Sequence, residues 1–153
     1  MTTTSALKKI DALKAKIDRY RPLDSHILKQ VREYFRIGMT YSSNALEGNS
    51  LTETETNSVI EDGITIGGKP LRDHLEALGH AEAYDLLFKL AKGKDITGAD
   101  VKELHRLFYY RIDAKQAGKY RGKRVIITGT DFIPPAPERL PDLMKSFIAG
   151  LPE

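Results

Sequence analysis

Ser43 and Glu47 have the residue types and the spacing that could do chemistry. They are four residues apart in residues 41–49 (YSSNALEGN), so on a helix their side chains meet on one face. Gly48, the next residue, is of the type that commonly ends a helix. An acid in a last turn faces the negative end of the helix dipole, which costs roughly 0.3–1 kcal/mol unless a cation compensates it. The pattern indicates either a carboxylate aimed at an arginine or a solvated glutamate before a turn.

A second candidate is the basic and β-branched stretch that follows Gly118. Residues 119–124 (KYRGKR) carry four positive charges and lead into residues 125–128 (VIIT), whose β-branched side chains favour a strand. Turn residues at 129–131 and the apolar pair at 132–133 predict a β-hairpin over about residues 119–135. The prolines that follow cannot donate to a ladder, so the pairing should stop there.

The charges on this predicted edge strand have two interpretations. Lysine and arginine on an edge strand commonly guard against unwanted pairing. Alternatively, the strand is left open so that the backbone of a partner can add to it, while the charges attract an acidic or phosphorylated ligand. The residues alone leave both interpretations open. The strand in question consists of Val125, Ile126, Ile127 and Thr128.

Two further patterns resemble nucleotide or metal sites but lack a required feature. Residues 63–70 (GITIGGKP) differ by one residue from a G-x-x-x-x-G-K-[ST] phosphate-binding loop, because Pro70 replaces the hydroxyl that holds magnesium. A turn leading into a helix is the alternative interpretation. The histidines show no metal-ligand spacing and no H-E-x-x-H motif, which favours surface or helix-packing roles. These residues are His26, His74, His80 and His105.

Helices must position both candidates. Apolar periodicity predicts a helix that begins near Ser5 and ends at Arg21-Pro22, and a second helix that runs from Asp24 or Ser25 toward Gly48. A capping box at residues 52–55 opens a short third helix. Three more helices are predicted over about residues 70–93, from residue 97 onward, and around residues 140–148. The fold class is therefore mainly α, with one small β-hairpin.

Composition limits the function classes. The chain has 153 residues, 41% of them hydrophobic, so it can bury a core. A net charge of +3 does not by itself indicate nucleic-acid binding. The absence of cysteine excludes disulfides and thiolate zinc sites. No apolar run approaches ~18 residues and the first residues do not form a signal peptide, so no membrane partner and a cytoplasmic location are the expectation.

Several segments, in order, resemble the Fic family. Residues 43–49 (SNALEGN) resemble the [S/T]-x-x-x-E-[G/N] inhibitory motif of Fic proteins that carry it N-terminal to the catalytic core. Residues 67–77 are similar to the region after that motif, and residues 104–107 with 117–121 are similar to the entry of the Fic core. Residues 125–135 resemble the flap, a β-hairpin that positions the target segment. The resemblance covers nearly the whole chain from about residue 28.

The resemblance implies nucleotidyl transfer. Fic enzymes typically move AMP from ATP, with Mg²⁺, to a serine, threonine or tyrosine hydroxyl of a protein. Their H-x-F-x-[D/E]-G-N-G-R signature supplies a histidine base, an acid for the metal, and amides and an arginine for the phosphates. The inhibitory glutamate pairs with a second arginine just after the signature and blocks productive placement of the γ-phosphate. By this resemblance Ser43, Glu47 and Gly48 are inhibitory, and Val125, Ile126, Ile127 and Thr128 dock the target.

The sequence departs from the family at one point, because it does not contain the signature. Residues 105–108 (HRLF) have the wrong spacing and no glycine-rich loop follows them. In the family the catalytic motif lies some tens of residues beyond the flap, and the chain ends before that point. The first hypothesis is therefore the N-terminal portion of a Fic-type AMP transferase without the C-terminal half of the core. Its predicted parts are residues 1–95, a helical region with the inhibitory helix, and residues 96–153, the first part of the Fic core.

This hypothesis predicts a chain that is inactive alone, binds neither ATP nor Mg²⁺ tightly, meets a protein substrate through the flap, and self-associates through uncovered apolar surface. The second hypothesis is a non-catalytic module that uses the hairpin edge and Glu47 to hold or inhibit a partner. A third is an autonomous phosphate-binding loop that depends on Lys69.

Overall fold

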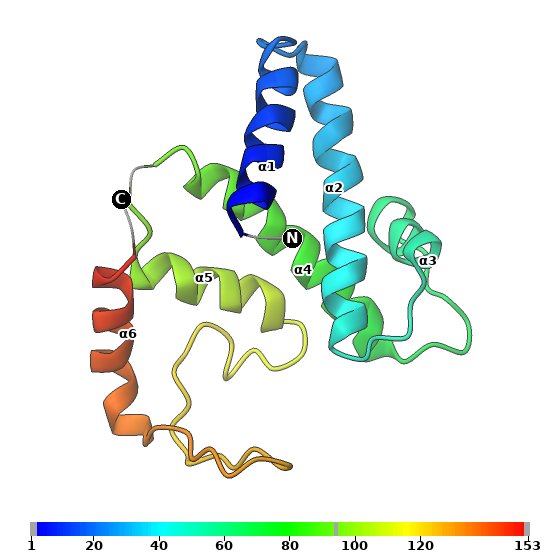
Figure 1. The fold of residues 1–153 in the computed structure, drawn as a ribbon. Coiled ribbons are helices and arrows are strands. Elements are labelled where there is room, and N and C mark those ends of the chain that lie inside the picture. The colour runs from blue at the N-terminus through cyan, green and yellow to red at the C-terminus, as the bar shows by residue number, and fades with distance from the viewer. Residues whose placement is uncertain (1–2, 94, 152–153) are drawn as a thin grey trace. The chain divides into compact units, whose positions relative to one another are not determined.

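The computed structural model describes residues 3–93 and 95–151, and the regular elements of this part of the chain are all helical (Figure 1). The mainly α prediction is thereby confirmed. The chain forms two compact units, one ending at Phe35 and the other beginning at Arg36. The predicted division after residue 95 stays a prediction.

The elements are α1 (Thr3–Asp18), α2 (Ser25–Leu46), α3 (Glu53–Asn57), the π-helix η1 (Ser58–Asp62), α4 (Leu71–Leu90), α5 (Gly98–Tyr109), the 3₁₀ turn η2 (Pro137–Arg139) and α6 (Leu140–Ala149).

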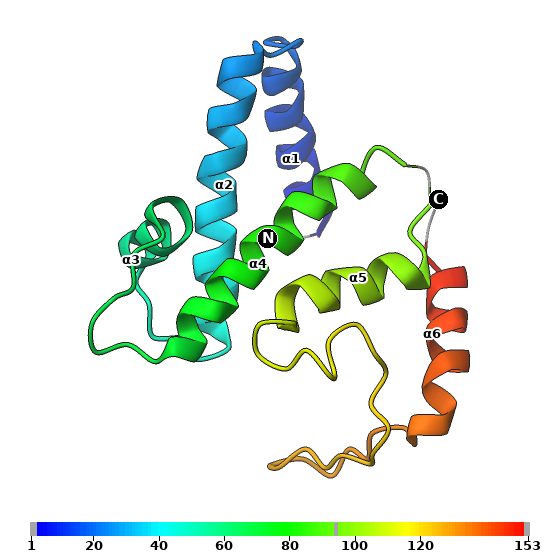
Figure 2. The same ribbon diagram turned by 180° about the vertical axis from the view of Figure 1, so that it is seen from behind.

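In the first unit, α1 runs antiparallel to the beginning of α2 (Figures 1 and 2). Ser5 lies inside α1, so it does not cap the helix as predicted. Asp24 caps α2, because its carboxylate accepts the amide of His26 at 2.8 Å. The cap satisfies an amide that the first turn of the helix would otherwise leave without an acceptor.

The second unit has a small core around α4. Leu51, Val59 and Ala77 are buried together, and Ile66 and Leu78 pack against them. The capping box at Thr52 is present: its hydroxyl accepts the amide of Glu55, and the Glu55 carboxylate accepts the Thr52 amide. The short helix that this box opens continues as the π-helix η1, which the sequence pattern did not predict. The wider turn of η1 still directs Val59 into the core.

Helices α4 and α5 pack side by side (Figures 1 and 2). Their contact depends on Gly79, since a Cβ atom there would lie 2.4 Å from the carbonyl oxygen of Phe108. Next to this crossing, the rings of His80 and Phe108 meet edge to face at 6.3 Å. The helix predicted from residue 97 onward is α5, and a capping box of Thr97 and Asp100 opens it.

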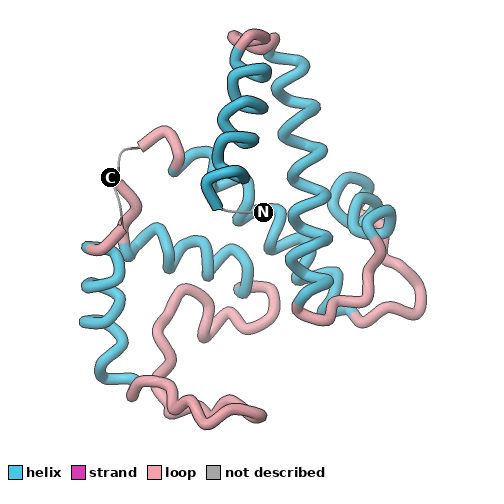
Figure 3. Tube along the Cα trace, in the orientation of Figure 1, coloured by secondary structure: helices cyan, strands magenta, loops and turns pink. Residues whose placement is uncertain are grey.

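The predicted β-hairpin is wrong. Residues 119–135, here called the arm, run outward and return, but the described part of the chain contains no strand (Figure 3). The local hydrogen bonds are instead the amide of Phe132 to the Thr130 hydroxyl and the Arg121 guanidinium to the Pro135 carbonyl. A short two-stranded ribbon without a covering layer is marginal in water, and prolines on the returning limb remove donors.

No helix within residues 3–93 and 95–151 has the length and apolar character needed to cross a membrane.

Candidate functional site at the end of α2

Helix α2 ends in a Schellman motif. The amide of Gly48 donates to the carbonyl of Ala45 at 3.1 Å, and the amide of Asn49 donates to the carbonyl of Asn44 at 3.0 Å. Gly48 has φ +90°, a conformation that glycine adopts without strain from a side chain. The helix therefore ends where the sequence predicts, and the chain reverses immediately after Glu47.

This ending places Glu47 in solvent. Its side chain is exposed, and within the described residues it has no ion pair or hydrogen bond. Ser43 lies one turn earlier and is half-buried, so the two predicted inhibitory residues share a helix face as their spacing requires. Asn44, between them, is 5% exposed, and its side-chain amide nitrogen has no hydrogen-bond partner in residues 3–93 and 95–151. The carboxylate is therefore available to a cation outside this part of the chain.

The C-terminal half of α2 is fixed to its neighbours. The Arg36 guanidinium lies 2.7 Å from the Glu61 carboxylate of η1 and 3.2 Å from the Asp85 carboxylate of α4. One turn later the Thr40 hydroxyl, fully buried, lies 3.0 Å from Nδ1 of His80. Glu47 therefore projects from the end of an anchored helix.

The turn after Glu47 is held by the first turns of α4. The carboxylate of Asp73 accepts both the amide and the hydroxyl of Ser50, at 2.7 and 2.5 Å. The side-chain amide of Asn49 donates to the Asp73 carbonyl at 3.0 Å and to Glu76 at 3.1 Å. Sequence reasoning missed these residues. The one signal for them was the pair of short polar residues that follows a helix-ending glycine.

Lys69 and His74 have structural contacts in the loop that resembles a phosphate-binding loop. The Lys69 ammonium donates to the Ser50 carbonyl at 2.5 Å and lies 3.4 Å from the Glu55 carboxylate. The buried ring of His74 accepts the amide of Ile66 at 2.8 Å through Nε2, and its Nδ1 lies 2.9 Å from the Pro70 carbonyl. The loop thus joins a π-helix to α4, and these contacts favour the turn interpretation.

The groups present do not fit a site for Mg²⁺ and ATP. Within residues 3–93 and 95–151, no three or more histidine, aspartate or glutamate side chains are grouped so that they could hold a metal ion. Lys69, the residue that a phosphate-binding loop would use, is engaged by Ser50 and Glu55. No reaction step is therefore assigned to a metal or nucleotide held by these residues.

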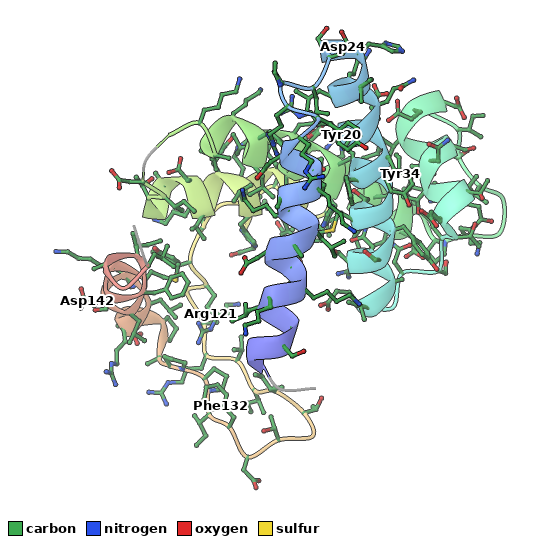
Figure 4. The ribbon with its side chains drawn as sticks, turned by 45° about the horizontal axis from the view of Figure 1, so that its top comes forward. Tyr20, Asp24, Tyr34, Arg121, Phe132 and Asp142 are labelled. Atoms are coloured by element: carbon green, nitrogen blue, oxygen red, sulfur yellow. The ribbon has the colours of Figure 1, made fainter. Side chains whose placement is uncertain are left out.

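The arm carries the predicted docking residues. Ile126 is 91% exposed, and Val125 and Ile127 are about half exposed at 46% and 48%. At the base of the arm, Arg121 is half-buried and its guanidinium joins the outgoing limb to the Pro135 carbonyl (Figure 4). Thr128 lies at the tip, next to Gly129, whose φ is +81°. The arm is an open loop with exposed apolar side chains, and a hydrogen bond between Arg121 and Pro135 joins its two limbs.

Comparison with known proteins identifies the family. No family model matches the chain. It is 36% identical over 109 residues, or 70% of its length, to a protein named protein adenylyltransferase Fic from Nematostella vectensis. It is 31% identical over 147 residues, or 92% of its length, to the protein of that name from Drosophila willistoni. The chain spans only 25% and 28% of these two relatives.

Solved structures give the same result. The fold matches a Fic domain containing signaling protein from Bacteroides thetaiotaomicron with a TM-score of 0.79 and 27% identity, over 92% of this chain and 54% of that one. It matches Fic-1 from C. elegans with a TM-score of 0.70 and 27% identity, over 96% of this chain and 45% of that one. The chain therefore belongs to the Fic family and corresponds to a part of these proteins.

Proposed function

We propose that the chain supplies the inhibitory helix end and the target-docking arm of a Fic-type protein adenylyltransferase, which moves AMP from ATP to a protein hydroxyl. The observation that carries the proposal is the end of α2, where a Schellman motif exposes Glu47 one turn after Ser43. The adenylyltransferase names of the relatives support the reaction class.

Glu47 would act by forming an ion pair with an arginine. Its carboxylate lies at the negative end of the α2 dipole and has no cation of its own among the described residues. An arginine at this helix end would therefore form an ion pair with Glu47 and would also be attracted by the helix dipole. In this proposal that arginine is the second one of the family's catalytic region, just after the Fic signature. While it is paired with Glu47 it cannot bind the γ-phosphate. The signature residues, which this sequence does not contain, would hold Mg²⁺ and ATP and supply the base.

The arm would hold the target segment by its backbone. Residues 125–127 are irregular, Thr128 begins the turn at the tip, and none of them has a ladder partner in the described chain, so their amides and carbonyls are open to pairing with an added strand. The exposed side chains of Val125, Ile126 and Ile127 would pack on that segment. Lys123 and Arg124 precede them and would favour an acidic target.

A chimera tests the inhibitory role. Residues 1–153 replace the matching part of the Bacteroides thetaiotaomicron Fic protein, and transfer of labelled AMP from ATP is measured. We expect little transfer from the unaltered chimera and much faster transfer after Glu47→Gly, because the arginine becomes available to the phosphate. Glu33→Gly, which alters another exposed glutamate of α2, is the control and should leave transfer low. Equal rates for the unaltered and Glu47→Gly chimeras would refute the proposal.

An alternative function is a non-catalytic module that holds or inhibits a partner through the arm and Glu47. The exposed arm favours it, because the arm needs no catalytic loop to bind a strand. The coding sequence discriminates the two. A reading frame that continues into H-x-F-x-x-G-N-G-R supports the transferase, whereas a stop codon after residue 153 supports the module.

A further inference from the structure

The turn that follows Glu47 is anchored by a buried acid. Asp73, in the first turn of α4, is 8% exposed, and its carboxylate accepts two hydrogen bonds from Ser50. Burial acts to raise the pKa of Asp73, but the bonds from the Ser50 hydroxyl and amide, with the nearby charge of Lys69, hold that pKa below its usual value. The charged form of Asp73 is thus the form that the turn requires.

Asn49 supplies a second attachment to the same helix. Its side-chain amide donates to the Asp73 carbonyl and to the Glu76 carboxylate, and its side-chain oxygen accepts the amide of Leu51 at 3.0 Å. Glu76 is itself oriented by Arg72, whose Nε donates to it at 2.8 Å. The side-chain nitrogen of Asn49 therefore holds the turn on α4, and its side-chain oxygen holds the turn itself.

The position of Glu47 depends on this attachment. The Glu47 side chain has no hydrogen bond or ion pair among the described residues, and it is separated from Asn49 only by Gly48, the least restricted residue type. The last turn of a helix frays when nothing holds the chain beyond it. Here the two residues after Gly48 are held by five hydrogen bonds to Asp73, Glu76 and Lys69.

We propose that Asp73 is a positioning residue for inhibition: through Ser50 and Asn49 it fixes the end of α2 and thereby aims the Glu47 carboxylate. The inference rests on the proposed inhibitory role of Glu47. It assigns control of that role to a residue whose hydrogen bonds go to Ser50 and Asn49 rather than to Glu47. Loosening the attachment should release inhibition while leaving the Glu47 side chain intact.

Hydrogen exchange on the 153-residue chain tests the attachment. After Asp73→Ala, the Ser50 amide should exchange at least about tenfold faster, because it loses its acceptor. Asp73→Asn keeps an acceptor oxygen, so the Ser50 amide should exchange near its original rate in this variant. The Asp100 amide, held by Thr97, is the internal control and should not change. An unchanged Ser50 rate in Asp73→Ala would overturn the proposal.

AMP transfer by the chimera tests the consequence. Asp73→Ala should raise transfer several-fold, Asp73→Asn should not, and adding Asp73→Ala to Glu47→Gly should give no further increase. A merely structural residue would lower transfer in both backgrounds. If circular dichroism shows that Asp73→Ala is unfolded, Asn49→Ala takes its place, since it leaves the bonds between Asp73 and Ser50 intact.

The two failures are distinguishable. If Glu47→Gly raises transfer and Asp73→Ala does not, or if their effects multiply, the positioning role of Asp73 is refuted and the inhibitory role of Glu47 stands. If Glu47→Gly leaves transfer unchanged, the proposed function is refuted, and the positioning role of Asp73 is refuted with it.

Discussion

At the residue scale, His80 lies where α2, α4 and α5 pack together. Its ring lies in α4 between the buried hydroxyl of Thr40 in α2 and the ring of Phe108 in α5. Burial lowers the pKa of His80. The folded chain therefore favours the neutral imidazole, because burial penalises the charged ring.

Stability should fall in mild acid because of His80. Its folded pKa lies below the unfolded value of about 6.5, so the unfolded chain takes up the proton first as the pH falls. The contribution of His80 is present above about pH 6.5 and is lost as the pH falls through the folded pKa. We expect the free energy of unfolding, measured with urea, to decline less between about pH 7.5 and 5.5 in His80→Asn than in the unaltered chain. His26→Asn, which alters an exposed histidine, is the control, and its free energy of unfolding should decline as much as that of the unaltered chain. If the free energy of unfolding of His80→Asn declines by the same amount, the role of His80 is contradicted.

At the same scale, the sequence predicts where residues lie on a helix better than it predicts which distant residues they contact. The spacing of Ser43, Glu47 and Gly48 predicted a shared helix face and an ending, and both are present. The contacts of Asp73 with Ser50 could not be predicted, because they join residues that are far apart in sequence and depend on how α4 returns to the end of α2. Local patterns determine helix ends, whereas long-range hydrogen bonds require the packed fold.

At the element scale, the crossing of α4 and α5 depends on the absence of a side chain at Gly79. Alanine favours a helix by about 1 kcal/mol over glycine, but its Cβ here would lie 2.4 Å from a backbone oxygen, which cannot move without shifting α5. We expect Gly79→Ala to lower the free energy of unfolding by about 1–3 kcal/mol, because the overpacking outweighs the propensity gain. Urea unfolding measures this change.

Gly98→Ala is the matched control, since Gly98 lies in the first turn of α5 and a Cβ there would meet nothing within 4 Å. Its free energy of unfolding should change by no more than about 0.5 kcal/mol. A Gly79→Ala chain as stable as Gly98→Ala would show that the two helices do not approach as described.

Helices and their caps were predictable because their signals are local. The capping boxes at Thr52 and Thr97 and the apolar periodicity of α2 and α5 each lie within one element. The arm was predicted wrongly because β-branched residues favour a strand only when a neighbouring strand or layer completes it. The π-helix η1, in which Val59 is buried, has no comparable local sequence signal.

At the scale of the whole molecule, the exposed apolar side chains of the arm and α6 predict self-association. Ile126, Ile133, Phe132 and Phe147 are between 57% and 91% exposed, and large apolar side chains left in solvent favour association. Light scattering of the purified chain should show a mass that increases with concentration, and Ile126→Ser combined with Ile133→Ser should reduce that increase. A constant monomer mass at all concentrations would contradict this prediction.

The chain alone should transfer no AMP, because the residues that the family uses for the base and the phosphates are not in its sequence. Incubation of the purified chain with labelled ATP and a protein acceptor should leave the acceptor unlabelled. Labelling that depends on the chain would show that another set of its residues performs the reaction.

The most direct test of the central claim changes only the charge of Glu47. Glu47→Gln keeps the size and shape of the side chain but cannot form an ion pair with an arginine. In the chimera, the ratio of the AMP-transfer rate of Glu47→Gln to that of the unaltered protein should exceed one by a wide margin, while Glu33→Gln should give a ratio near one. A ratio near one for Glu47→Gln would show that the carboxylate at the end of α2 does not restrain the reaction.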